Sequence, residues 1–467
     1  MSKQNNLTDF LTDVANAIRA KKGSTDLINP QNFSAEIATL SGGLEVIEMT
    51  ETTATIEPNK VYVWGMVESL DITLGESTGE SDFFAFRFRC SKPTMTSLTV
   101  NGATWAEDTE LDEAGKPVLD LGSWYQCEVK GGTSALYARL AHYIPFEDSN
   151  VEAVLLAKGV GDGLGITYKD AAKVTTISTW FNGNGVITSF DELKYFKNIT
   201  TLGASTFKNC LNLEKVNLDN IVKLTGWDGA GAFYNSGIKE VRLPKLSVID
   251  NSYCCEFQDS LVERILSLGK ITTIPNGNTN FGFCKNCKLL TYVNLPDTLT
   301  SIGVDAFRGC LLLTRVANFE NTKVTIINVD AFRGCTSLAE ITLPASLTSI
   351  GNAAFNYCKL LTRVLNLENT KVTSIGANAF TDCSALSEIT LPASLTSIGN
   401  AAFNSCSSLQ YIRIEATTPP TLASTNAIPS TIGAIYVPDA SVAAYQAATN
   451  WSSFASKIKG ISEMPAE

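Results

Sequence analysis

Cysteine is the residue type whose number and spacing in this chain could carry chemistry. Among the 12 cysteines, Cys284 and Cys287 form a C-x-x-C pair, a spacing that in isolation indicates a redox or metal site. With Cys254 and Cys255 this pair would supply four thiolates, the number of ligands that tetrahedral zinc requires. Zinc binding by these four residues is therefore one interpretation of the pattern.

The remaining cysteines favour a structural role. A phenylalanine stands three residues before each of five cysteines: Phe307 before Cys310, Phe332 before Cys335, Phe355 before Cys358, Phe380 before Cys383 and Phe403 before Cys406. Cys284 stands three residues before Cys287, so it occupies a phenylalanine position of the same pattern. Free cysteine inside a protein behaves as a small hydrophobic residue. We therefore expect a ladder of buried thiols, with no metal and no cofactor.

The other candidates for catalysis are few. His142 is the single histidine, and its strand-like context favours a structural role. The carboxylate pairs Glu147/Asp148 and Asp191/Glu192 are sequence neighbours on segments that we expect to be solvated, and such neighbours rarely face one another as glycoside hydrolysis requires. The sequence thus predicts a protein that is not an enzyme, with no catalytic residue; an enzyme that degrades a surface polysaccharide is the alternative.

These residues sit in a sequence that repeats itself. LAEITLPASLTSIGNAAFN begins at Leu338 and LSEITLPASLTSIGNAAFN at Leu386, an offset of 386 − 338 = 48 residues. The cysteines from Cys287 to Cys406 divide this length in two, because they recur at steps of 23, 25, 23, 25 and 23 residues. Such a period is typical of a solenoid, in which each repeat contacts its neighbours and the array presents an extended surface.

The hydrophobic pattern changes along the chain and predicts a mainly β protein of several domains. Residues 44–145 alternate with a period of two, and we expect strands at 52–56, 61–67, 70–74, 84–88, 98–100 and 124–129. The predicted parts are short helices in 1–43, a β-sandwich in 44–145, a linker and solenoid edge cap in 146–165, the solenoid in 166–416 and a C-terminal cap in 417–467. In the last part we expect a strand at 434–437 and a helix at 442–458.

The N-terminal segment carries apolar residues at helical spacing: Leu7, Phe10, Leu11, Val14, Ile18, Phe33, Ile37 and Leu40. About 40 residues cannot bury such stripes on their own. The stripes therefore pack on the next domain, or they self-associate or dock into a larger assembly. We favour attachment and homo-oligomerisation.

Charge and hydropathy exclude several partners. The net charge is −11, with 44% hydrophobic and 18% charged residues, which argues against nucleic acid or an anionic membrane as the main partner. No stretch approaches the ~18 apolar residues of a membrane-spanning helix, and the first residues lack the apolar core of a secretory signal. We expect no membrane insertion.

The repeat resembles a known family. The pattern C-x-x-L-x-x-I-x-L-P-x-x-L-x-x-I-G-x-x-A-F-x-x-C is similar to the BspA-like leucine-rich repeat over about residues 200–416, and the segment Ile435 to Asp439 resembles the one that commonly follows such arrays in Bacteroidetes proteins. The resemblance implies a surface adhesin or interaction protein without catalytic residues. The pattern is poorly kept at 244–286, which leaves room for a pocket or an insertion there.

The N-terminal part resembles a different group. LTDVANAIRAKKGSTDLINPQNFSAEIATL is similar to a module of phage tail-fibre and other virion appendage proteins, and IEPNKVYVWGMVESLDITLG to a β-domain of such proteins from phages of gut Bacteroidetes. This resemblance covers about residues 9–145. It implies a virion structural protein, made in the host cytoplasm, that attaches to other virion proteins through its N-terminal segment. A bacterial or protist cell-surface adhesin is the alternative.

Within the repeats, polar and aromatic residues beside the expected strands are the candidates for binding a host-surface glycan or protein. A plain solvated face is the alternative reading of the same positions. The candidates are Lys239, Arg242, Tyr292, Glu340, Glu388, Tyr411 and Arg413.

Overall fold

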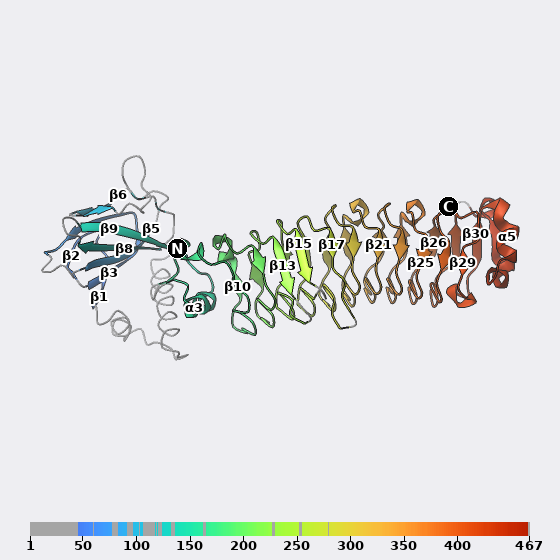
Figure 1. The fold of residues 1–467 in the computed structure, drawn as a ribbon, viewed down its shortest axis with the longest axis horizontal. Coiled ribbons are helices and arrows are strands. Elements are labelled where there is room, and N and C mark those ends of the chain that lie inside the picture. The colour runs from blue at the N-terminus through green and yellow to red at the C-terminus, as the bar shows by residue number, and fades with distance from the viewer. Residues whose placement is uncertain are drawn as a thin grey trace. The chain divides into compact units, whose positions relative to one another are not determined.

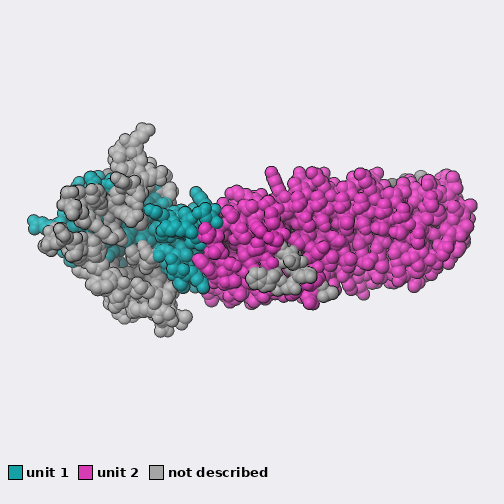
Figure 2. All heavy atoms as spheres, in the orientation of Figure 1, with its two compact units in different colours: residues 1–174, 195–198 teal, residues 175–194, 199–467 magenta. Residues whose placement is uncertain are grey.

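The computed structural model describes residues 45–58, 60–76, 83–90, 97–101, 103–105, 117, 119, 124–131, 136–161, 165–226, 229–251, 255–278 and 280–465. Its chain divides into two compact units (Figure 2): unit 1 contains residues 1–174 and 195–198, and unit 2 contains 175–194 and 199–467. The eight attachment residues from Leu7 to Leu40 lie outside the described residues, so their role stays a prediction. No helix of the described part is both long and apolar enough to cross a membrane.

Unit 1 contains two β-sheets. The larger sheet has, in spatial order, β1 (Glu45–Met49), β3 (Lys60–Val67), β5 (Phe83–Cys90), β8 (Trp124–Gly131), β9 (Leu136–Tyr143) and β7 (Thr104–Trp105). The smaller sheet has β2 (Thr53–Ile56), β4 (Ser69–Leu74) and β6 (Ser97–Asn101). All six predicted strands are confirmed; β1, β7 and β9 were not predicted.

The two sheets of unit 1 share a core, and most of their neighbouring strands pair in parallel. β1, β3 and β5 pair in parallel in one sheet, as do β2, β4 and β6 in the other. Antiparallel pairing is confined, among the described strands, to β5 with β8 and β8 with β9. Buried Trp64, Phe86 and Ile72 belong to one apolar cluster fed by both sheets. This pairing differs from the antiparallel pattern typical of β-sandwiches.

Two short helices follow the sheets of unit 1. α3 (Ser149–Ala157) lies in the segment 146–165, and the Asp148 carboxylate caps it by accepting a hydrogen bond from the Asn150 backbone N at 2.9 Å. α4 (Tyr168–Ala171) begins with a capping box between Thr167 and Asp170. Such reciprocal bonds satisfy backbone donors that a helix start leaves free.

Unit 2 is a solenoid of parallel coils (Figure 1). Its first face contains β10 (Ser189–Phe190), β12 (Lys215–Val216), β14 (Glu240–Arg242), β16 (Arg264–Ser267), β18 (Tyr292–Asn294), β20 (Arg315–Ala317), β22 (Glu340–Thr342), β24 (Arg363–Leu365), β26 (Glu388–Leu391), β28 (Tyr411–Ile414), β30 (Ala434–Val437) and β31 (Ile458–Gly460). Its second face contains β11 (Thr201–Leu202), β13 (Lys223–Gly226), β15 (Val248–Asn251), β17 (Thr273–Ile274), β19 (Ser301–Ile302), β21 (Ile326–Ile327), β23 (Ser349–Ile350), β25 (Ser374–Ile375), β27 (Ser397–Ile398) and β29 (Thr421–Leu422).

Short 3₁₀ helices connect some of these strands. They are η2 (Asp191–Tyr195), η3 (Phe319–Asn321), η4 (Leu367–Asn369), η5 (Thr425–Ala427), η6 (Asp439–Ser441), η7 (Trp451–Lys457) and η8 (Ile461–Glu463). η3 and η4 lie 48 residues apart, since 367 − 319 = 48. The period of the sequence is therefore also the period of the local structure.

A ladder of phenylalanines forms the centre of the solenoid. The ring centroids of Phe332 and Phe355 are 5.4 Å apart and those of Phe355 and Phe380 are 5.3 Å apart, with interplanar angles of 2° and 8°. The cysteine thiols donate hydrogen bonds to backbone carbonyls of the ladder phenylalanines. The Cys383 Sγ donates to the Phe355 carbonyl at 3.2 Å and the Cys406 Sγ to the Phe380 carbonyl at 3.1 Å. The prediction of buried structural thiols is confirmed for these residues, which are 0% exposed.

The segment 244–286 forms coils of the same kind as the rest of unit 2, although its sequence follows the repeat pattern poorly. Phe257 joins the ladder 5.4 Å from Phe233, and Ser260 takes the cysteine position with its Oγ 3.6 Å from the Cys287 Sγ. The Cys310 Sγ donates to the carbonyl of Cys284 at 3.1 Å, the bond that a phenylalanine carbonyl accepts elsewhere. The placement of Cys284 in a phenylalanine position is thus confirmed.

The C-terminal part differs from the prediction. The strand at 434–437 is confirmed as β30, but the single helix expected at 442–458 is wrong. α5 (Val442–Ala447) ends before Asn450, whose left-handed backbone (φ 65°) separates it from η7, and β31 then pairs with β30. Buried Tyr445 and Trp451 fix this turn, because their side chains donate to the carbonyls of Ala416 and Pro420, both at 2.8 Å.

We expect Phe355→Ala to lower the free energy of unfolding by about 3–5 kcal/mol, because it removes one ring from a close-packed ladder. Phe355→Leu keeps most of the volume and should cost less than about 1.5 kcal/mol. Chemical denaturation of the full chain, followed by circular dichroism, measures both. An alanine variant as stable as the leucine variant would contradict the ladder as the centre of the core.

Tyr357 occupies a corner position where the backbone is left-handed (φ 62°), and the same position of the preceding coil is Gly334 (φ 74°). An L-residue in this conformation costs about 1–2 kcal/mol, which asparagine and glycine largely avoid. Tyr357→Asn should therefore raise the free energy of unfolding by about 1 kcal/mol. Gly334→Ala, whose new Cβ would meet nothing closer than 3.7 Å, should lower it by a similar amount.

Candidate ligand-binding surface of the repeat array

Outward residues on the first face of unit 2 form one row, here called the central row. Strands of this face alternate inward and outward residues, so Val293 is buried while Tyr292 is partly exposed. The same position in successive coils is occupied by Glu240, Arg264, Tyr292, Arg315, Glu340, Arg363, Glu388 and Tyr411. The central row is therefore made of charged and aromatic side chains.

Contacts inside the central row centre on its two tyrosines. The Arg264 Cζ lies 5.4 Å from the Tyr292 ring centroid and the Arg315 Cζ lies 6.0 Å from it. The two arginines come from the strands on either side of Tyr292. At these distances the guanidinium groups are attracted to the ring by cation–π interaction. At the other end of the row, the Tyr411 hydroxyl donates to the Glu388 carboxylate.

The structure brings together most of the residues predicted from the sequence. Tyr292, Glu340, Glu388 and Tyr411 all lie in the central row. Arg242 and Arg413 lie two residues further along β14 and β28.

Two of the predicted residues are already engaged in ion pairs. Arg413 is paired through its Nε with a Glu415 oxygen at 2.7 Å. Lys239, just before β14, has its Nζ 3.6 Å from a Glu214 oxygen and 3.7 Å from a Glu263 oxygen. Their charges are therefore partly compensated within the array.

Four residues of the central row were missed in the sequence: Glu240, Arg264, Arg315 and Arg363. A signal for two of them was present. Arg315 and Arg363 stand five residues after Cys310 and Cys358, as Tyr292 stands five residues after Cys287. Within the described part of the chain, Arg264, Arg315 and Arg363 make no ion pair, so their charges are available to a partner.

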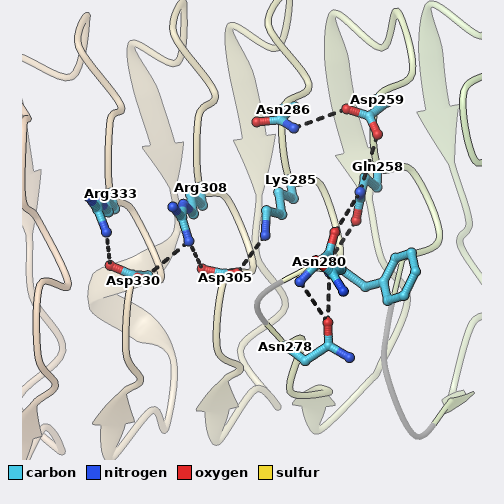
Figure 3. A network of polar contacts seen from close by, with 12 residues as sticks. Gln258, Asp259, Asn278, Asn280, Lys285, Asn286, Asp305, Arg308, Asp330 and Arg333 are labelled. Carbon is cyan, nitrogen blue, oxygen red and sulfur yellow. Dashed lines mark hydrogen bonds and ion pairs between the residues drawn. The ribbon is translucent and has the colours of Figure 1, made fainter. Parts of the chain in front are cut away.

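A second polar region, here called the polar corner, is a network of charged and polar side chains from successive coils (Figure 3). Lys285 and Asp305 form a buried ion pair at 2.8 Å between Nζ and Oδ2. The chain of charges continues from Asp305 to Arg308 at 3.3 Å, from Arg308 to Asp330 at 3.4 Å and from Asp330 to Arg333 at 3.4 Å. Each carboxylate of this chain thus lies between two cations.

Near the polar corner, the buried side chains of Gln258 and Glu256 accept hydrogen bonds from backbone N–H groups of neighbouring coils. In a regular coil the Asp330 N donates to the Asn352 carbonyl at 3.0 Å. At the corresponding position of its coil, the Gly282 N donates instead to Gln258 Oε1 at 2.9 Å. The Ala232 N, which directly precedes Phe233, donates to Glu256 Oε2 at 2.9 Å. Buried backbone donors need such partners. Gln258 and Glu256 therefore satisfy backbone donors in this irregular part of the array.

The buried thiols are poor candidates for chemistry. Burial raises the pKa of Cys210 and that of Cys406 to about 12. The thiolate is the form that binds metals and attacks electrophiles, so these groups are protonated at neutral pH. The described residues contain no cluster of three or more histidine, cysteine or acidic side chains placed to hold a metal ion. Of the zinc candidates, Cys254 lies outside the described residues.

The remaining catalytic candidates have structural contacts. The His142 ring lies 4.4 Å from the Tyr125 ring and 4.1 Å from the Tyr168 ring, between centroids. Asp148 caps α3. The Lys194 hydrogen bond to Asp191 lowers the pKa of that carboxyl below its usual value. A lowered pKa suits a structural carboxylate and opposes the raised pKa that a general acid needs.

The family comparison decides the class of this array. The model described as BspA type leucine-rich repeat region matches six copies at residues 181–314, 279–368 and 313–421. Together these ranges span 181–421, more than half of the 467 residues. The chain belongs to the BspA-type leucine-rich repeat family. Repeat proteins of this kind are typically non-catalytic interaction modules.

Solved structures of leucine-rich repeat proteins resemble parts of the chain. One from Bacteroides ovatus is 19% identical, covers 61% of this chain and 87% of its own, and has a TM-score of 0.33. A leucine-rich cell surface protein from Faecalibacterium prausnitzii is 19% identical over 62% and 82%, with a TM-score of 0.28. The leucine-rich repeat protein of T. pallidum is 24% identical over 41% and 86%, with a TM-score of 0.25. No functionally curated protein matches the chain.

We expect Asp305→Ala to lower the free energy of unfolding by about 3–5 kcal/mol, because it leaves the Lys285 ammonium buried without its carboxylate. The double variant Asp305→Ala/Lys285→Met removes both charges and should recover part of that loss. Urea denaturation of the single and double variants compares them. Equal stability of the two variants would show that the buried ion pair is not coupled.

Thiol reactivity checks the cysteine ladder. In native protein at pH 8, we expect the ladder cysteines to resist iodoacetamide, because burial keeps them protonated and inaccessible. In denaturant the same residues should react fully. Peptide mass spectrometry reads each site separately, and rapid native labelling of Cys358 or Cys383 would contradict the burial of the ladder.

Proposed function

We propose that the chain is a non-catalytic recognition protein: an appendage of a phage virion, of tail or head fibre type, whose repeat array binds a ligand on the host-cell surface. The observation that carries the recognition role is the central row, where three arginines that pair with no carboxylate of the described residues and two tyrosines occupy one surface. Arginine and tyrosine are enriched among residues that dominate binding energies.

The virion role rests on the resemblance of residues 9–145 to phage appendage proteins. In this proposal the apolar stripes of residues 1–43 attach the chain to other virion proteins and bring copies of it together. Several copies on one particle would convert weak contacts into stable adhesion, because later contacts form at high effective concentration. The repeats would then act as the distal, receptor-binding part.

The location is tested on purified phage particles from the source community. Mass spectrometry should find the chain in the particles, and gold-labelled antibody should mark tail or capsid projections. Absence from particles together with labelling of cell surfaces would replace the virion role by that of a cell-surface adhesin.

Binding through the central row makes a second test. We expect the full-length protein to label host cells, and Tyr292→Ala to weaken that binding by about tenfold or more, because it removes the ring that holds Arg264 and Arg315 by cation–π interaction. Tyr357→Asn is the matched control, since this tyrosine is 44% exposed at the corner of a coil and outside the row. Equal loss in both variants would place the ligand elsewhere on the array.

A further inference from the structure

The charges of the central row alternate with a period of two coils. Arg264, Arg315 and Arg363 occupy every second coil, and the coils between and beside them carry Glu240, Tyr292, Glu340 and Glu388. Neighbouring strands of a sheet are about 4.8 Å apart, so successive arginines are about 9.6 Å apart along the array. This period is close to the length of a disaccharide in an extended glycan chain.

The arginines present their charge outward without internal neutralisation. They are exposed, and within the described residues no carboxylate pairs with them, although Glu240 is the register neighbour of Arg264 and Glu340 that of Arg363. Guanidinium groups bind carboxylates and sulfates through paired hydrogen bonds. The row therefore offers three anion contacts at equal intervals.

Tyr292 does not serve as a stacking platform for a sugar ring. Arg264 and Arg315 approach its ring from the two neighbouring strands, at 5.4 and 6.0 Å from the centroid. A sugar would have to displace both guanidinium groups to reach the faces of the ring. The ring instead holds the two cations in place.

The glutamates of the central row disfavour a ligand that carries a negative charge on every sugar residue. Glu340 lies in the coil between those of Arg315 and Arg363, and Glu388 in the coil after Arg363. An ionised carboxylate accepts hydrogen bonds from hydroxyl groups and repels other anions. A ligand that fits the row therefore alternates acidic and neutral groups with the same period.

We propose that the central row binds a linear acidic polysaccharide with one carboxylate or sulfate in each disaccharide, lying along the array with its acidic groups on Arg264, Arg315 and Arg363. This inference rests on the proposed recognition function and names its ligand class. The neutral sugars between the acidic groups donate hydroxyl hydrogen bonds to the glutamates.

The test uses the full chain and three immobilised polysaccharides. Hyaluronan has one carboxylate in each disaccharide, polygalacturonate has one on every residue, and dextran is uncharged. We expect hyaluronan to bind most tightly, with an affinity that falls as salt rises because the contacts are ionic. Equal binding of dextran or tighter binding of polygalacturonate would overturn the proposal.

The matched variants remove three positive charges from the same three coils. Arg264→Gln/Arg315→Gln/Arg363→Gln should weaken hyaluronan binding at least tenfold. Lys270→Gln/Lys323→Gln/Lys371→Gln removes exposed lysines that precede the second-face strands of those coils, and it should change binding less than twofold. A larger loss in the lysine variant, or none in the arginine variant, would overturn the proposal. So would a loss of self-association in the arginine variant without a loss of hyaluronan binding, because the row would then be an interface between copies.

Binding to host cells separates this inference from the function on which it rests. If wild-type protein labels host cells and the arginine variant labels them equally, the polysaccharide is not the ligand, while the recognition function stands. If wild-type protein labels no host cell, the proposed function itself fails. We expect wild-type labelling that free hyaluronan reduces and that the arginine variant lacks.

Discussion

Every feature of unit 2 depends on one constraint: identical positions of successive coils must pack on one another in register. The phenylalanine rings meet at 5.3 to 5.4 Å through the regular coils, and the thiols of Cys358, Cys383 and Cys406 each donate to a phenylalanine carbonyl of the coil before. A coil alone cannot bury its apolar side, so its stability comes from its neighbours. The same register that stacks the rings inside aligns the charged residues of the central row outside.

Where the sequence deviates from the repeat, the structure keeps this register by other means. Cys284 takes a phenylalanine position, and its carbonyl accepts the thiol bond that the ladder requires. The side chains of Gln258 and Glu256 accept hydrogen bonds from the backbone N–H groups of Gly282 and Ala232 in neighbouring coils. The charges of Lys285 and Asp305 are buried together in the adjoining corner. The polar corner therefore has a structural role, because its side chains form hydrogen bonds and ion pairs within the array.

The sequence predicts the solenoid well, because apolar spacing, phenylalanine and cysteine all recur with one period. It also predicts six strands of unit 1, from their hydrophobic pattern and the turn residues between them. It fails where the signal is ambiguous or depends on distant residues. Leu136 and Leu140 of β9 are spaced as in a helix, and the break of the 442–458 helix depends on Tyr445 and Trp451 reaching carbonyls of an earlier coil. Half of the central row was predicted, because residues were selected by their type and not by their position after the cysteine. Arg264 could not be found from that position, since its coil has Ser260 in place of the cysteine.

The 48-residue offset between near-identical segments corresponds to two coils, which is also the period of the charge alternation on the first face. Two coils form one full period of that alternation, so duplication of a two-coil segment lengthens the array without disturbing the order of its charges. Insertion of a single coil would shift every later coil by one position, so that a glutamate of the central row would stand where the alternation requires an arginine. Selection for a surface of this kind would favour growth in pairs, and the pairing of LTRV and LSEI or LAEI coils between Leu313 and Asn404 is the record that such growth would leave.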